Sequence, residues 1–291
     1  MAERLFGVIA SNFDMMQPMK DLYSKCVGTG EAILMIHGVM SDHENFNRIQ
    51  QILGRDYKTI TYDRRGYGVD FDLSYADQDY SVKTQAEEAI SVLKHYTEAP
   101  SFIIGDSTGG DIAIQTAILF PRFVKGIFLV ETTISCDGLD LSCLHEWRNS
   151  VRHIARSNNI YSVIPLFAKM IGSKPTAQKS DLKNIKKTIY NIRNYIYGEM
   201  KDITDYSFAY NEVSNIPCPV IMGISSEGKD LPFGIGAKRT ADFFGWETVY
   251  LPGYHNTIQE YPYEFSLHVL TFFKSISANN LLHRGVSDIV P

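Results

Sequence analysis

Gly105-Asp106-Ser107-Thr108-Gly109 decides the fold of this chain. The apolar run 100–104 leads into it and predicts a strand, while the segment 110–117 leads out of it and predicts a helix. A serine on such a tight strand-to-helix turn has its hydroxyl pushed into the open, and crowding leaves room only for glycine at the flanking positions. The G-x-S-x-G pattern alone is weak evidence for such a turn, so the interpretation depends on the strand predicted before it and the helix predicted after it.

Short, nearly continuous apolar runs elsewhere predict the other strands of a sheet buried on both faces. Helical patterns alternate with these runs, as in segment 82–93, where apolar residues share one helix face. The alternation predicts an α/β fold with a mostly parallel, doubly wound sheet and right-handed crossovers. The strand-like runs are 22–26, 32–36, 58–62, 102–104, 126–130, 220–224 and 247–251.

One long segment breaks this alternation. Residues 134–214 contain no convincing strand, are helical in pattern and lie between two predicted strands. We therefore expect them to form an inserted helical cap, and expect residues 1–133 and 215–291 to form the α/β core.

Composition excludes several classes of function. The chain has 291 residues and a net charge of −5, which argues against nucleic acid as a partner because phosphate-binding proteins usually carry a basic excess. No apolar run is long enough to span a bilayer. Residues 1–10 include Glu3, which makes them a poor signal peptide and a good candidate for a first strand.

The cysteines and histidines favour a cytoplasmic protein without a cofactor. The four cysteines form no C-x-x-C pair, so we expect reduced thiols. No H-x-x-x-H, H-E-x-x-H or G-x-G-x-x-G pattern stands where a metal or nucleotide site needs it, and we expect neither group. Sequence alone leaves a homodimer open.

Two further segments complete a chemical constellation with Ser107. A serine hydroxyl needs a base and a pair of donors for the oxyanion. His255, in a loop between a strand and the final helix, is the best base, and His43 is the competitor that is hardest to exclude. After the strand 32–36, His37-Gly38-Val39-Met40 can supply a backbone N–H from Val39, helped by Gly38; Thr108 can supply the second.

With these motifs the chain resembles the capped, single-domain branch of the α/β-hydrolase fold across nearly its full length. The matching segments are His37-Gly38, the strand and turn from Tyr62 to Gly68, the Ser107 turn and the His255 loop. The resemblance implies that Ser107 attacks an acyl carbon, that His255 shuttles the proton and that an acid orients His255.

The acid is harder to assign. The family usually places it after the strand before the histidine loop, in a G-x-x-D arrangement, and this spacing is not met after Gly223. Asp230, close to a following proline, is the first choice, and Glu227 is the alternative. Glu131, after the preceding strand, is a third option. All three keep the order Ser, acid, His.

The resulting expectation is a cofactor-free serine hydrolase, esterase-like, that cleaves a small to medium acyl substrate. Contacts with substrate are expected from His37, Asp106, Tyr161 and Tyr195; Asp106 can also favour a cationic His255 or simply point elsewhere. A ligand receptor with slow turnover, or a C–C hydrolase or lyase, uses the same residues and stays open.

Overall fold

The computed structural model describes residues 22–68, 78–157, 159–172 and 182–287. Their central feature is a seven-stranded sheet with the order β1-β3-β2-β4-β5-β6-β7. β1 is antiparallel to β3, and all other neighbours are parallel, so the α/β prediction is confirmed. The strands are β1 (Ser24–Val27), β2 (Ala32–Ile36), β3 (Lys58–Tyr62), β4 (Ser101–Asp106), β5 (Val124–Val130), β6 (Val220–Ser225) and β7 (Glu247–Leu251).

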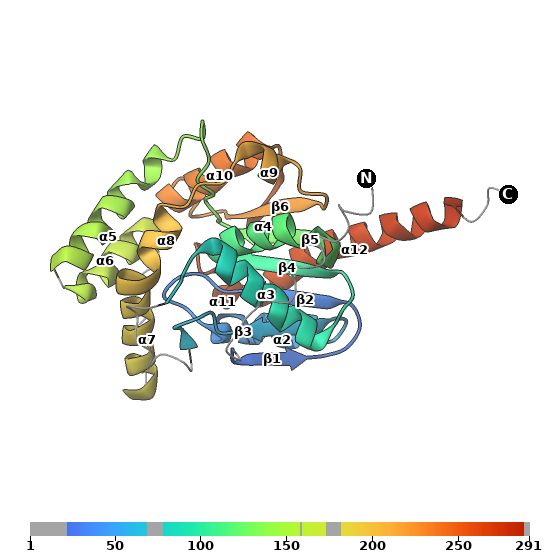
Figure 1. Ribbon diagram of the computed structural model, residues 1–291, viewed down its shortest axis with the longest axis horizontal. Coiled ribbons are helices and arrows are strands. Elements are labelled where there is room, and N and C mark those ends of the chain that lie inside the picture. The colour runs from blue at the N-terminus through green and yellow to red at the C-terminus, as the bar shows by residue number, and fades with distance from the viewer. Residues whose placement is uncertain (1–21, 69–77, 158, 173–181, 288–291) are drawn as a thin grey trace, which may run out of the picture.

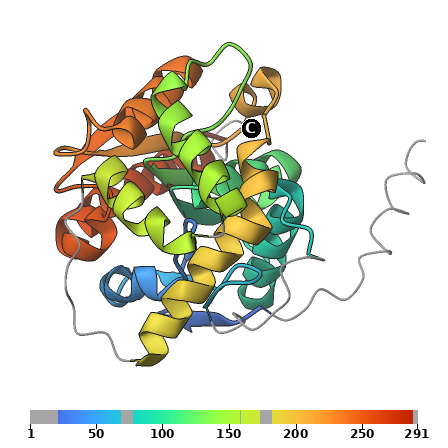
Figure 2. The ribbon, with the colours of Figure 1, turned by 90° about the vertical axis from the view of Figure 1, so that its left-hand side faces the viewer.

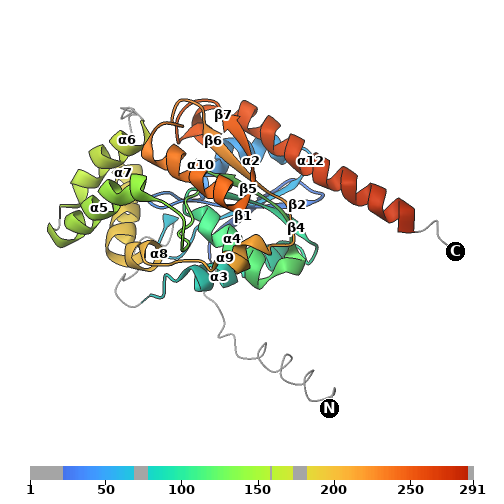
Figure 3. The ribbon, with the colours of Figure 1, turned by 90° about the horizontal axis from the view of Figure 1, so that it is seen from above.

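Helices cover both faces of this sheet, which is why its strands read as continuous apolar runs (Figure 3). One face packs on α3 (Val82–Tyr96), α4 (Gly109–Leu119), α9 (Tyr210–Ser214) and α10 (Pro232–Phe244). The other packs on α2 (Asn47–Leu53), α11 (Thr257–Glu260) and α12 (Pro262–Ser287). Short 3-10 helices connect these parts: η1 (His43–Phe46) and η3 (Pro121–Phe123).

Between residues 134 and 214 the described elements are helical, and the helices α5 to α8 gather at one end of the molecule (Figure 1; Figure 2 looks onto them). They share a third apolar cluster, built around Trp147 and Tyr195 and joined by Phe233 of α10. The elements are η4 (Ser142–Leu144), α5 (His145–Ser157), η5 (Ile160–Ser162), α6 (Val163–Ile171), α7 (Leu182–Asn194), the π-helix η6 (Tyr195–Glu199) and α8 (Met200–Thr204), before α9.

The sequence also led to expectations about the cysteines, about membrane-spanning segments and about residues 1–10. All four cysteines are free thiols, as expected. Within the described part of the chain, no helix is long and apolar enough to cross a membrane. The strand expected in residues 1–10 lies outside the described residues.

Candidate active site

Ser107 stands directly after β4 in a strained backbone conformation. Its φ is 52°, in the left-handed region that side chains rarely adopt. Its N–H donates to the carbonyl oxygen of Val130 (2.8 Å), and its own carbonyl accepts from the hydroxyl of Thr132 (3.0 Å). These bonds to the neighbouring strand hold the turn in place.

The glycines of the turn are required by close approach of backbone. A Cβ at Gly109 would lie 2.1 Å from the carbonyl oxygen of Ile36, and a Cβ at Gly105 would lie 2.6 Å from the Cα of Gly110. The turn predicted from G-x-S-x-G therefore forms for the predicted steric reason.

Strained backbone gathers at this edge of the sheet. Among the described residues, three that are not glycine have positive φ: Met40, Ser107 and Glu131. They come soon after the neighbouring strands β2, β4 and β5, respectively. Such strain persists where the surroundings fix it, and it concentrates at functional sites.

Glu131 contacts His255. The Nδ1 atom of His255 lies 2.5 Å from Oε2 of Glu131, and both side chains are buried. Oε1 of Glu131 accepts from the N–H of Ser225 (3.0 Å) and from its hydroxyl. An N–H at Nδ1 that donates to the carboxylate leaves Nε2 as the nitrogen that can accept a proton.

The contact shifts both pKa values. Burial of His255 acts to lower its pKa, but the hydrogen bond and charge of Glu131, with the charge of Asp106, outweigh it and raise the pKa above its ordinary 6.5. Burial acts to raise the pKa of Glu131, yet the bond and charge of His255 and the bonds from Ser225 hold it below its ordinary 4.5.

The structure therefore corrects the choice of acid beside His255. Asp230 and Glu227 are exposed, and the carboxylate that His255 meets is that of Glu131. The backbone of the loop after β6 is fixed by two hydrogen bonds: the N–H groups of Ser226 and Glu227 donate to the carbonyls of Leu251, the last residue of β7 (2.7 Å), and of Gly253 (3.1 Å). In this loop the side chains of Glu227 and Asp230 face solvent.

Ser107 and His255 open onto one cavity of about 320 Å³. Its apolar wall comes from α6 and α7, including Ile164, Phe167 and Ile192. The Phe167 ring also stands edge-on to the His255 ring, with centroids 5.9 Å apart, so it shields the imidazole from solvent. The full lining is Gly38, Val39, Met40, Ser41, Asn45, Asp106, Ser107, Ile164, Phe167, Ala168, Thr188, Ile192, His255, Asn256 and Gln259.

The residues expected to donate to an oxyanion lie beside Ser107. A Cβ at Gly38 would come 3.0 Å from the Cβ of Ser107, so this glycine lets the two backbones approach, and Val39 follows it in the cavity wall. Thr108 is the N-cap residue of α4. Backbone N–H groups at a helix start have no acceptor within the helix, which leaves them available to an anion.

Three residues expected to touch substrate have other roles in the structure. His37 is fully buried; its Nδ1 donates to the carbonyl of Gly38 (2.8 Å) and its Nε2 accepts from the N–H of Arg64 (3.0 Å). Burial, together with the charge of Arg64, lowers the pKa of His37 to about 3, so it is neutral. Tyr161 is 62% exposed, and Tyr195 stacks on Trp147 in the helical cluster; neither lines the cavity.

Asp106, the fourth, does line the cavity. Its Oδ2 accepts from Nδ2 of Asn45 (2.8 Å), and Oδ1 of Asn45 in turn accepts from Nε2 of Gln259 (2.5 Å). Burial raises the pKa of the Asp106 carboxyl to about 6, although His255 and the bond from Asn45 act to lower it. Asn45 and Gln259 were not singled out from the sequence, since nothing in their local pattern marks them.

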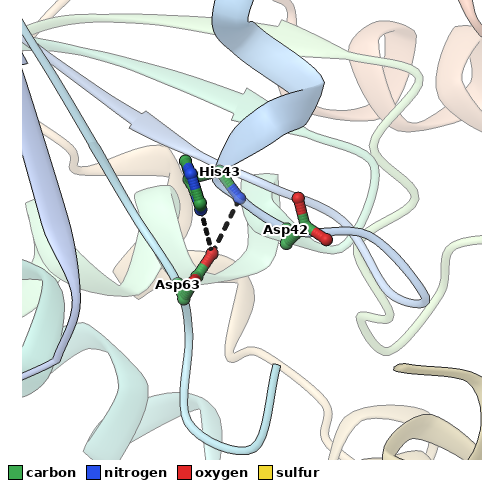
Figure 4. A group of neighbouring side chains, drawn as sticks. All are labelled: Asp42, His43 and Asp63. Atoms are coloured by element: carbon green, nitrogen blue, oxygen red, sulfur yellow. Dashed lines mark hydrogen bonds and ion pairs between the residues drawn. The ribbon is translucent and has the colours of Figure 1, made fainter. Parts of the chain in front are cut away.

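His43, the competing histidine, belongs to a different cluster, with Asp42 and Asp63 (Figure 4). Its Nδ1 lies 2.6 Å from Oδ1 of Asp63, which also accepts from the N–H of His43 (2.9 Å). Oδ2 of Asp42 lies 3.1 Å from the ammonium of Lys187. Hydrogen bonds and the ion pair with Lys187 therefore join these side chains to other groups of the protein.

Comparison with known proteins establishes the fold family. The family model described as "alpha/beta hydrolase fold" matches residues 31–208. The chain belongs to the α/β-hydrolase fold family. This α/β hydrolase is 24% identical over 263 residues to a Bacillus subtilis protein named "Uncharacterized hydrolase YraK", a match that covers 88% of this chain and 93% of the relative.

Solved structures share the fold of this α/β hydrolase. A thermophilic esterase from Thermogutta terrifontis has a TM-score of 0.68 at 14% identity, covering 88% of this chain and 93% of the esterase. MenH from S. aureus has a TM-score of 0.66 at 17% identity, covering 88% of this chain and 99% of MenH. At these identities the likeness establishes the fold alone.

Proposed function

We propose that this protein is a serine hydrolase that cleaves esters of small to medium acyl groups through an acyl-enzyme, with Ser107, His255 and Glu131 as its triad. The observation that carries the proposal is the joint placement of Ser107 and His255 on one cavity, with His255 bonded to a buried carboxylate. A nucleophile, a base and a group that orients the base are the parts that acyl transfer needs.

In the proposed mechanism, Oγ of Ser107 attacks the acyl carbon while Nε2 of His255 accepts the hydroxyl proton. The N–H groups of Val39 and Thr108 stabilise the oxyanion. His255 then donates the proton to the leaving alcohol. A water that gives a proton to His255 then attacks the acyl-enzyme. The bond to Oγ of Ser107 breaks, His255 returns the proton to Oγ, and the acid is released. Glu131 holds the imidazole in its tautomer and stabilises the imidazolium. No step requires a cofactor.

The cavity supports the proposed size of the acyl group. Its volume of about 320 Å³ is near the lower end for small-molecule sites. Because α6 and α7 supply its apolar wall, we propose that segment 134–214 acts as a cap that holds the acyl chain. A long lipid chain would exceed this space.

Steady-state hydrolysis of 4-nitrophenyl butyrate and hexanoate by the wild-type protein and by Ser107→Ala tests the proposal. We expect multiple turnovers by the wild type and loss of enzymatic turnover in the variant, with circular dichroism confirming that it is folded. Equal rates in the two proteins would contradict the proposal. A burst of one equivalent without further release would instead indicate a ligand receptor on this fold.

A further inference from the structure

Asp106 is a buried carboxylate beside the nucleophile that the proposed mechanism does not use. It is 9% exposed and lines the same cavity as Ser107 and His255. A carboxylate is costly to bury without partners, so its position calls for an explanation.

The carboxylate is held in a fixed orientation. Asn45 donates to it, and the backbone of Gly38 provides a second hydrogen bond. Since Oδ1 of Asn45 accepts from Gln259, the amide of Asn45 must turn its NH₂ group toward Asp106. A carboxylate offers about four acceptor positions. The two bonds therefore leave acceptor capacity for a ligand in the cavity.

The charge of the cavity is negative. The described residues that line it include Asp106 but neither lysine nor arginine. Glu131 adds a second negative charge behind His255. Cations nearby are already paired or bonded. Arg64 bonds to the carbonyl of Gly38 (3.1 Å) and is paired with the buried Glu199. In the adjoining polar hollow of about 630 Å³, Lys187 is paired with Asp42 (3.1 Å) and Glu44 (2.5 Å), and Arg48 meets the carbonyl of Gln259 (3.4 Å).

We infer that Asp106 makes this site selective for charge, favouring esters that carry an alkylammonium group near the scissile carbonyl and disfavouring esters that carry a carboxylate there. An ammonium bearing alkyl groups matches the surroundings, because the same cavity has the apolar side chains of Ile164, Phe167 and Ile192. The inference rests on the proposed hydrolase function and names its substrate class.

Isosteric ester pairs test it. On the alcohol side, butyrylcholine is compared with 3,3-dimethylbutyl butyrate. On the acyl side, the 4-nitrophenyl ester of 4-(trimethylammonio)butanoic acid is compared with that of 5,5-dimethylhexanoic acid, and 4-nitrophenyl hemiglutarate is the anionic substrate. We expect the wild type to prefer the cation in one of the two series by kcat/KM, on the order of tenfold, and to hydrolyse hemiglutarate least.

The variant Asp106→Asn keeps the shape of the side chain and removes its charge. We expect it to lose the preference for the cation and to gain relative activity on hemiglutarate. Glu260→Gln is the matched control, since Glu260 is an exposed carboxylate of the adjoining hollow, and it should keep the wild-type preference. No preference in either series of the wild type, or a preference that survives in Asp106→Asn, would overturn the inference.

A binding measurement separates this inference from the proposed function. The ketones that correspond to the same ester pairs cannot be hydrolysed, and calorimetry gives their affinities. If the wild type binds the cationic ketone more tightly and Asp106→Asn does not, the inference stands even where no ester is turned over. If esters are turned over but neither kcat/KM nor ketone affinity favours the cation, the proposed hydrolase function is supported and the inference about Asp106 fails.

Discussion

His255 and Glu131 are joined across two strand ends: Nδ1 of His255, in the loop after β7, lies 2.5 Å from Oε2 of Glu131, the first residue after β5. β5 lies next to β4, which carries Ser107 at its end. Because β4 and β5 are parallel neighbours, Ser107 and Glu131 lie at the same edge of the sheet, where both strands end. The loop after β7 places His255 at this edge as well.

The pH dependence of hydrolysis should report this contact. In the proposed mechanism Ser107 needs a neutral His255, and the bond to Glu131 raises the pKa of His255 above 6.5. We therefore expect kcat/KM to rise with pH through an apparent pKa above 6.5. In Glu131→Gln the raising effect is lost, so the acidic limb should move to lower pH while the plateau falls. A limb that stays in place would show that Glu131 does not act on His255.

Asp106→Asn provides a second test of the same electrostatics. The negative charge of Asp106 also raises the pKa of His255. With a neutral 4-nitrophenyl ester we expect the acidic limb to move to lower pH, by less than in Glu131→Gln because Asp106 acts through charge alone. Full pH profiles of kcat/KM for the two variants measure both shifts of the acidic limb. A larger shift in Asp106→Asn than in Glu131→Gln would contradict this expectation.

A buried ion pair joins the helical segment to the sheet. The guanidinium of Arg64, just after β3, bonds to Glu199 of η6, and both side chains are fully buried. Removing one partner leaves a buried charge uncompensated. Glu199→Gln should lower the free energy of unfolding by about 3–5 kcal/mol, as measured by urea denaturation.

The exposed ion pair between Arg152 and Asp205 (3.0 Å) is the control for that measurement. Water screens such a pair, so Asp205→Asn should cost no more than about 1 kcal/mol. If Glu199→Gln and Asp205→Asn lower the free energy of unfolding by the same amount, the buried pair contributes no more to stability than the exposed one.

Asp111 in α4 should make stability fall as pH rises. Burial raises the pKa of its carboxyl from 3.8 to about 8, so the folded protein binds a proton that the unfolded chain has released. Between these values the folded state is therefore favoured at lower pH, and stability is lost as pH approaches 8. Asp111→Asn should remove this slope, so its melting temperature relative to the wild type should increase from pH 5 to pH 8. A constant difference would refute the assignment.

The Ser107 turn allows a steric test. A Cβ at Gly109 meets the carbonyl oxygen of Ile36 at 2.1 Å, whereas a Cβ at Gly245, the C-cap of α10, meets nothing within 4 Å. Gly109→Ala should destabilise the fold by about 3 kcal/mol or more, because backbone must move. Gly245→Asn should cost about 1 kcal/mol or less, since asparagine tolerates its positive φ. Urea denaturation compares them; similar losses would contradict the steric account.

The sheet and the serine turn were predictable because both follow from local sequence. Apolar runs and the crowded glycines determine them, and the seven strands predicted within the described residues form. The His255–Glu131 contact depends on which strand ends are adjacent. Glu131 could be recognised as an acid after a buried strand, but Asp230 was preferred because a proline follows it closely. No sequence pattern shows that the loop after β6 bonds to the end of β7 and to the chain beyond it.

Tyr161 and Tyr195 illustrate a second limit. Both lie in helical segments where aromatic residues are frequent, and sequence cannot tell which side of such a helix meets a cavity. Tyr195 packs on Trp147 and Tyr161 meets solvent, while Ile164 and Phe167 form the wall. His37 was also expected to contact substrate, yet its ring bonds to the backbone of Gly38 and Arg64.

The most direct test of the proposed triad is kcat/KM of Glu131→Gln and Asp230→Asn for the same 4-nitrophenyl ester. Both variants replace a carboxylate by its amide, but only Glu131 bonds His255 in the structure. We predict a loss of about 10⁴-fold in Glu131→Gln, because the imidazole tautomer is no longer fixed, and activity near wild type in Asp230→Asn. A severe loss in Asp230→Asn with near-normal activity in Glu131→Gln would contradict the account.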